Sequence, residues 1–118
     1  MVREAHPLVG SWIVTFPDEP GVGSGLNAFT ADGIVLQANP GRPGQGSWEP
    51  TGERTAAMTL VIVLGEGVIK VRGELQVDAA GSRFTGSFTT ERLGDGLGEK
   101  GPLTVVGERI AVETPAAG

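Results

Sequence analysis

Apolar and polar side chains alternate along short segments of the chain, which predicts β-strands. The clearest alternation spans residues 68–78, where odd positions from 69 to 77 are apolar or glycine and even positions from 70 to 78 are charged or amide. Successive strand side chains point to opposite faces, so residues 69, 71, 75 and 77 should be buried and 70, 72, 74 and 76 exposed. Eight such segments are predicted, at residues 9–16, 24–30, 34–38, 45–49, 54–64, 68–78, 83–92 and 103–113.

The connections between these segments are short and rich in glycine and proline. Twenty glycines and eight prolines are spread along the chain, as in folds with many tight turns. Residues 39–44 predict the most irregular loop, residues 93–101 predict a flexible one, and only a turn at residues 4–8 has helical character. The pattern therefore predicts an all-β fold: a single domain over residues 1–118 that forms an eight-stranded antiparallel up-and-down β-barrel.

Two separated residues predict how this barrel closes. Trp12 follows Gly10-Ser11 in the first predicted strand, and Arg109 lies in the last. The first and last strands of a closed barrel are neighbours, so the guanidinium of Arg109 can stack on the indole of Trp12 and donate to nearby carbonyls. We therefore assign Trp12 and Arg109 to barrel closure.

Gly10-x-Trp12 in the first strand together with Arg109 in the last resembles the lipocalin-like (calycin) barrels, in which the Trp packs across the closed end and the Arg covers it. The segments Phe29-Thr30-Ala31-Asp32-Gly33 and Phe84-Thr85-Gly86 look like those of small bacterial lipocalin-like proteins. This chain is shorter than true lipocalins and has neither their disulfides nor a predicted helix after the barrel. These departures bring it nearer to compact cyclase barrels, such as the allene oxide cyclases and the spirotetronate cyclases of polyketide pathways.

Composition removes several classes of function. The formal net charge of −5 disfavours a nucleic-acid partner, and the absence of cysteine excludes disulfides and thiolate chemistry. One histidine without cysteine does not make a zinc site, and no cofactor is expected. No apolar run reaches the ~18 residues of a membrane helix, and residues 1–7 lack the apolar core of a signal peptide, so we expect a cytoplasmic protein without membrane partners.

An eight-stranded barrel is wide enough to be filled by side chains or to hold one small ligand. We expect a ligand site at the end away from Trp12, with the loop at residues 39–44 gating its mouth. Trp48 is either a cavity wall or core, the amides of Asn27 and Gln37 point either inward or outward, and His6 is expected at the surface. The candidate ligand-binding residues are Asn27, Gln37, Trp48, Met58, Leu60, Phe84 and Phe88.

Three functions fit this architecture. The first is binding of a small apolar molecule in the barrel. The second is a cavity enzyme of cyclase or isomerase type, which folds a flexible polyketide-like or lipid-like substrate by positioning and desolvation; no catalytic residue is identified, because no serine has an adjacent base. The third is a structural protein with a filled barrel. Segments 9–16, 54–64 and 103–113 are apolar on both faces, around Ile13, Val63 and Ile110 for example, which predicts a homodimer.

Overall fold

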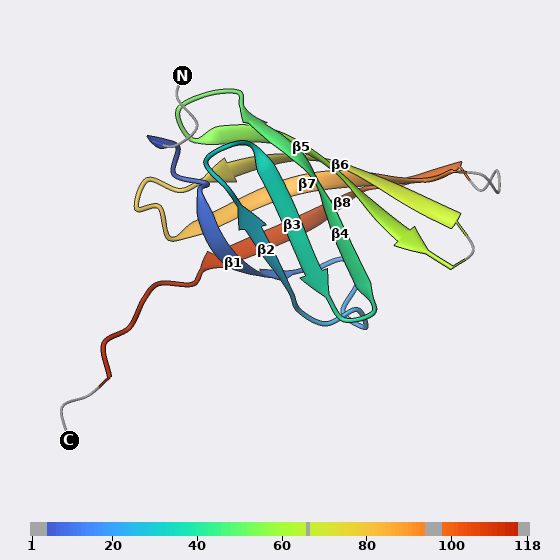
Figure 1. Ribbon diagram of the computed structural model, residues 1–118, viewed down its shortest axis with the longest axis horizontal. Coiled ribbons are helices and arrows are strands. Elements are labelled where there is room, and N and C mark those ends of the chain that lie inside the picture. The colour runs from blue at the N-terminus through green and yellow to red at the C-terminus, as the bar shows by residue number, and fades with distance from the viewer. Residues whose placement is uncertain (1–4, 66, 94–97, 116–118) are drawn as a thin grey trace.

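The structure is a computed structural model that describes residues 5–65, 67–93 and 98–115. Its strands form a closed barrel in which each strand pairs antiparallel with its neighbours in sequence and β1 also pairs with β8 (Figure 1). The predicted all-β barrel of eight strands is confirmed. Among the described residues, no helix has the length and apolar character needed to cross a membrane. The strands are β1 (Gly10–Thr15), β2 (Gly25–Phe29), β3 (Ile34–Asn39), β4 (Arg42–Pro50), β5 (Thr55–Leu64), β6 (Gly67–Val77), β7 (Arg83–Leu93) and β8 (Gly98–Arg109).

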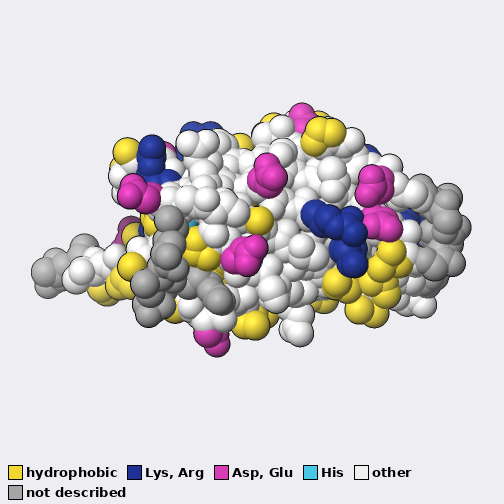
Figure 2. All heavy atoms as spheres, turned by 90° about the horizontal axis from the view of Figure 1, so that it is seen from above, with side chains coloured by type: hydrophobic (Ala, Val, Ile, Leu, Met, Phe, Trp, Pro, Cys, Tyr) yellow, Lys and Arg dark blue, Asp and Glu magenta, His cyan; other side chains and the backbone are white. Residues whose placement is uncertain are grey.

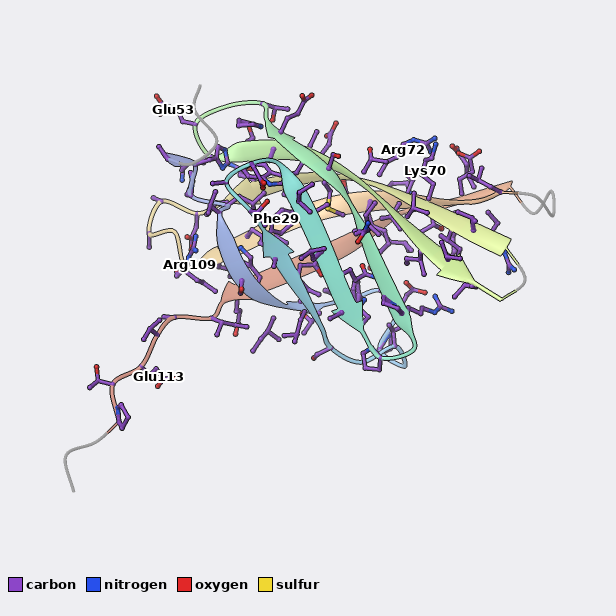
Figure 3. The ribbon with its side chains drawn as sticks, viewed as in Figure 1. Phe29, Glu53, Lys70, Arg72, Arg109 and Glu113 are labelled. Atoms are coloured by element: carbon purple, nitrogen blue, oxygen red, sulfur yellow. The ribbon has the colours of Figure 1, made fainter. Side chains whose placement is uncertain are left out.

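The register predicted for β6 is confirmed. Residues 69, 71, 75 and 77 are buried, residues 72, 74 and 76 are exposed, and Lys70 is half-buried. Arg72 forms an ion pair with Glu91 of β7 at 2.9 Å on the outer face, and Lys70 and Arg72 project from the outside of the sheet (Figure 3). Figure 2 shows acidic and basic side chains interspersed over this side of the molecule, with small apolar patches between them.

The prediction of an irregular loop at residues 39–44 is wrong. β3 continues to Asn39 and β4 begins at Arg42, so only Pro40 and Gly41 remain as a turn, and Gly41 has a φ of 72°. Gly46 lies in β4, as predicted, and a Cβ there would collide with the backbone of β5. A small residue is therefore required by close strand approach there, and the mouth has a tight hairpin instead of a gating loop.

The second predicted loop and the end of the last strand also need correction. β7 continues to Leu93 and β8 begins at Gly98, so residues 98–102 are strand; residues 94–97 lie outside the described residues. A register shift between Phe88 and Thr90 accommodates Gly101 and Pro102, as bulges commonly do. β8 ends at Arg109, so Ile110 and Val112 lie beyond it in an exposed segment.

The core fills one end of the barrel. Trp12, Phe29 and Phe84 are fully buried and meet edge to face, with ring centroids 5.0 Å apart for Trp12–Phe84 and 6.2 Å for Phe29–Phe84. Phe29 points into the barrel (Figure 3). At the other end, β5 to β8 are longer than β1 to β3 and extend past them as a curved sheet (Figure 1). The two ends of the barrel thus differ: one is packed and the other is bounded by the long strands.

Candidate ligand-binding cavity

Arg109 closes the packed end of the barrel. Its guanidinium lies 4.3 Å from the centroid of the Trp12 ring, the contact predicted from sequence. It donates to the carbonyls of Gly81, at 2.6 Å, of Val9, at 2.9 Å, and of Pro7. Gly10 has a φ of 134°, and a Cβ there would lie 2.5 Å from Nη1 of Arg109. The glycine of Gly10-x-Trp12 therefore makes room for the guanidinium that covers the indole.

His6 lies in the same closure, and its predicted surface position is wrong. The side chain is 5% exposed. Its Nδ1 accepts from the amide of Leu8 at 3.1 Å, so the proton is on Nε2, which donates to the carbonyls of Gly52 and Thr55 at 3.1 and 3.0 Å. The ring also meets Trp48 edge to face at 5.5 Å. Every polar atom of this imidazole is satisfied by backbone, which makes it a structural residue.

Three of the seven candidate ligand-binding residues are buried in the core without lining the cavity. Trp48 is 3% exposed, donates from Nε1 to the carbonyl of Thr30 at 2.9 Å, and is therefore core. Leu60 and Phe84 are also buried in this core. The side chain of Phe84 occupies the space next to Gly107. These three residues do not line the cavity described next.

The opposite end of the barrel contains a cavity of about 350 Å³. The other four candidates, Asn27, Gln37, Met58 and Phe88, line it. The amides of Asn27 and Gln37 thus face inward, settling the alternative left open by the sequence. The cavity is bounded by Val14, Phe16, Glu19, Val22, Asn27, Gln37, Asn39, Arg42, Met58, Ile62, Ile69, Val71, Phe88, Thr90, Arg92, Gly98, Glu99, Lys100, Leu103 and Val105.

The walls of this cavity differ in polarity. Amides from β2 and β3 form one wall: Asn27 pairs with Gln37 across the ladder, and Asn39 follows two residues later on the same face. Facing strands contribute aliphatic and aromatic side chains, with Met58, Ile62, Ile69, Val71, Phe88, Leu103 and Val105 among them. An apolar pocket with a few placed polar groups is the usual form of a small-molecule site.

Charged groups gather at the mouth of the cavity. Lys100 of β8 pairs with Glu19 at 3.1 Å, and Glu99 lies 3.9 Å from Arg72 on the outer face. Arg42 is exposed at the start of β4. The lining residues that are fully buried carry no charge, so the electrostatics of this site change from charged at the rim to neutral at the floor.

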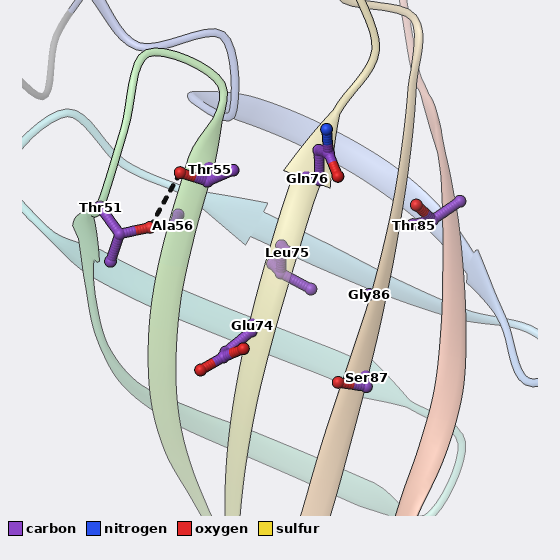
Figure 4. Close-up of a pocket in the computed structure, with 9 residues that line it drawn as sticks. All are labelled: Thr51, Thr55, Ala56, Glu74, Leu75, Gln76, Thr85, Gly86 and Ser87. Atoms are coloured by element: carbon purple, nitrogen blue, oxygen red, sulfur yellow. Dashed lines mark hydrogen bonds between the residues drawn. The ribbon is translucent and has the colours of Figure 1, made fainter.

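A second, larger depression of about 550 Å³ lies on the outside of β5, β6 and β7 (Figure 4). Glu74, Gln76, Thr85 and Ser87 border it and are exposed, and Thr51 and Thr55 are joined by a hydroxyl hydrogen bond of 3.0 Å. Its outward-facing polar side chains remain in contact with water. The smaller interior cavity removes more ligand surface from water, so we take it as the candidate site.

Comparison with protein-family models, with curated proteins and with solved structures finds no match to this chain. The site must therefore be interpreted from its own chemistry. Within residues 5–65, 67–93 and 98–115, no three His, Asp or Glu side chains are grouped to hold a metal ion. The cavity itself offers apolar contact, amides and a charged rim.

Proposed function

We propose that the protein binds a small apolar molecule in the interior cavity. The observation that carries the proposal is the contrast between the two ends of the barrel. Aromatic rings and Arg109 fill one end, whereas the other leaves about 350 Å³ between largely apolar walls. Burying apolar ligand surface in such a space contributes about 25 cal/mol per Å² before the costs of association.

The two alternatives have less support. A filled structural barrel fits only the end that contains Trp12. For a cavity enzyme, the lining carboxylate of Glu19 lies at the mouth in an ion pair with Lys100, and that of Glu99 lies within ion-pair distance of Arg72 on the outer face. General acid–base chemistry needs a carboxyl or imidazole within hydrogen-bond reach of the substrate. The buried lining residues provide none, which puts binding ahead of catalysis.

A fluorescent dye displays the binding directly. N-phenyl-1-naphthylamine is uncharged and brightens in apolar surroundings, and its own emission is the readout because both Trp residues lie outside the cavity. We expect saturable binding with one dye per chain. Leu103→Trp, on the cavity wall, should abolish it by filling the space. Thr104→Trp, the next residue of β8 and exposed, is the matched control and should bind like the wild type.

The wild-type protein and the two variants also define the results that would refute the binding proposal. Circular dichroism and urea denaturation establish first that both variants are folded. Absence of saturable dye fluorescence with the wild-type protein at tens of micromolar would refute the proposal. Equal dye binding by Leu103→Trp and the wild type would place the dye elsewhere and refute it as well.

A further inference from the structure

One polar side chain lies at the floor of the apolar cavity. Asn27 is 7% exposed, and it is the only polar residue among the described lining residues that are buried. In the ladders it pairs with Trp12 of β1 and Gln37 of β3, which fixes its inward direction. Other buried lining residues include Val14 and Met58. The fold therefore places a carboxamide among buried apolar side chains at the floor of the cavity.

The Oδ1 atom of Asn27 is buried and has no hydrogen-bond partner among the described residues. Neighbouring inward groups differ: Trp12 donates from Nε1 to the carbonyl of Leu8 at 3.0 Å, and Gln37 donates from Nε2 to the carbonyl of Arg42 at 2.9 Å. In the part of the chain that the structure describes, one other buried side-chain atom lacks a hydrogen-bond partner, Oδ1 of Asn39, which lies closer to the mouth in the space beside Gly25. Buried polar atoms are nearly always paired, so an unpaired one at a cavity floor points to a partner from outside the chain.

We propose that Asn27 is the polar subsite of this cavity and that its ligand is a neutral apolar molecule with a hydroxyl group, bound hydroxyl-first. This inference rests on the proposed function. The hydroxyl donates to Oδ1 of Asn27 at the floor, and the apolar body contacts Met58, Val71 and Phe88 toward the mouth. Such a hydrogen bond satisfies the buried amide and fixes the orientation of an otherwise featureless ligand.

The charge distribution selects a hydroxyl over a carboxylate. The cations that line the cavity lie toward its mouth, where Arg42 is exposed and Lys100 pairs with Glu19. A carboxylate at the floor would be buried among aliphatic side chains without a cation, at a large desolvation cost. It would also place negative charge against the acceptor Oδ1. A hydroxyl avoids both penalties because it is neutral and donates.

Two isomers test the hydroxyl specifically. 1-Nonanol and methyl octyl ether have the same atoms, but only the alcohol donates a hydrogen bond. Each displaces N-phenyl-1-naphthylamine in a competition titration, and the ratio of their affinities is the measured quantity. Because the difference in hydration between the isomers is the same for every variant, a change in this ratio reports the protein partner. Asn27→Leu should lower the preference for the alcohol about tenfold, the size expected for one buried hydrogen bond.

Gln45→Leu is the matched control, since this amide is exposed on β4 and lies outside the cavity; the ratio should stay at the wild-type value. An unchanged ratio in Asn27→Leu would overturn the inference and leave apolar binding intact. If Asn27→Leu does not fold, Asn27→Ala takes its place, and an alcohol-to-ether ratio equal to that of the wild type overturns the inference. A dye that binds but is displaced by neither isomer overturns it too. If the wild-type protein does not bind the dye, the proposed function and this inference are both refuted.

Discussion

Replacing Arg109 by methionine tests how the packed end of the barrel is closed. Methionine keeps much of the apolar stem but removes the guanidinium. Three backbone carbonyls, of Pro7, Val9 and Gly81, then lose their charged donor, and Trp12 loses the cation above its ring. Because these contacts join β8 to the segment before β1 and to the β6–β7 turn, their loss should weaken the whole barrel.

The magnitude follows from those contacts. A hydrogen bond to a charged group contributes about 1.5–3 kcal/mol and a cation–π contact about 0.5–2 kcal/mol. The side chain is half-buried, so water reaches some of the freed carbonyls and the terms do not sum fully. We expect the free energy of unfolding to fall by about 3–5 kcal/mol, out of about 5–15 kcal/mol for a typical domain.

Urea denaturation followed by Trp fluorescence measures this loss. With a slope of about 2 kcal/mol/M, the midpoint should fall by about 2 M. Arg72→Met is the control: its ion pair with Glu91 is on the outer face, where the Arg72 side chain is 44% exposed. Exposed pairs contribute about 0–1 kcal/mol, so this midpoint should move little. If Arg109→Met shifts the midpoint no more than Arg72→Met, Arg109 does not close the barrel.

Four further outcomes are expected. Gly10→Ala should lower the urea midpoint by at least 1 M, through a strained φ and a clash with the guanidinium; an unchanged midpoint contradicts the closure geometry. Asn27→Leu should raise the ligand-free stability by about 1–3 kcal/mol by removing a buried amide oxygen that has no hydrogen-bond partner among the described residues, and a loss of stability would argue against that state. Hydrogen bonds led by the Ser82 amide lower the pKa of Asp78 below 3.8, so its stabilisation is present above that pH and lost as the pH falls through the lowered value. Asp78→Asn should therefore flatten the acid limb of the stability curve, and an identical limb refutes this. Light scattering should report twice the 12.1 kDa chain mass, and Ile110→Asp should reduce it; a monomer at high micromolar concentration ends the dimer hypothesis.

The homodimer prediction rests on apolar side chains on the outer surface of the barrel. The structure shows such side chains on the segments indicated by the sequence and on two further strands. Ile13, Val63 and Ile110 are exposed, at 45%, 70% and 46%. β2 and β3 add Leu26 and Leu36, which are 46% and 43% exposed. Ile13 pairs with Leu26 across the β1–β2 ladder, so β1 and β2 share one apolar strip. The homodimer itself stays a prediction.

Alternation along a strand predicts which way a side chain faces but not whether it lines a cavity. Trp48, Leu60 and Phe84 face inward and belong to the same core cluster as Met58, yet of these four only Met58 lines the cavity. Which inward side chains border open space depends on the register of all the ladders together, which a single sequence does not display. The apolar wall was therefore missed in part, including Val71, although its inward direction was predictable.

Other residues escaped prediction because their partners are backbone atoms. His6 is held by carbonyls of Gly52 and Thr55, 46 and 49 positions away, and no side-chain motif signals such contacts. By contrast, the contact between Trp12 and Arg109 was predictable, because the first and last strands of a closed barrel pair with each other. That Oδ1 of Asn27 has no hydrogen-bond partner among the described residues is likewise visible only once the packing around it is known.

Met58 provides the most direct test that the cavity binds an apolar ligand. The chain has two methionines, Met1 and Met58, so isotope labelling of methionine methyl groups gives a sparse spectrum with one reporter inside the cavity. Titration with 1-nonanol should shift the Met58 signal saturably and produce magnetisation transfer between its methyl group and the ligand chain. A Met58 signal that stays at its ligand-free position while the ligand saturates the protein would contradict binding in the barrel.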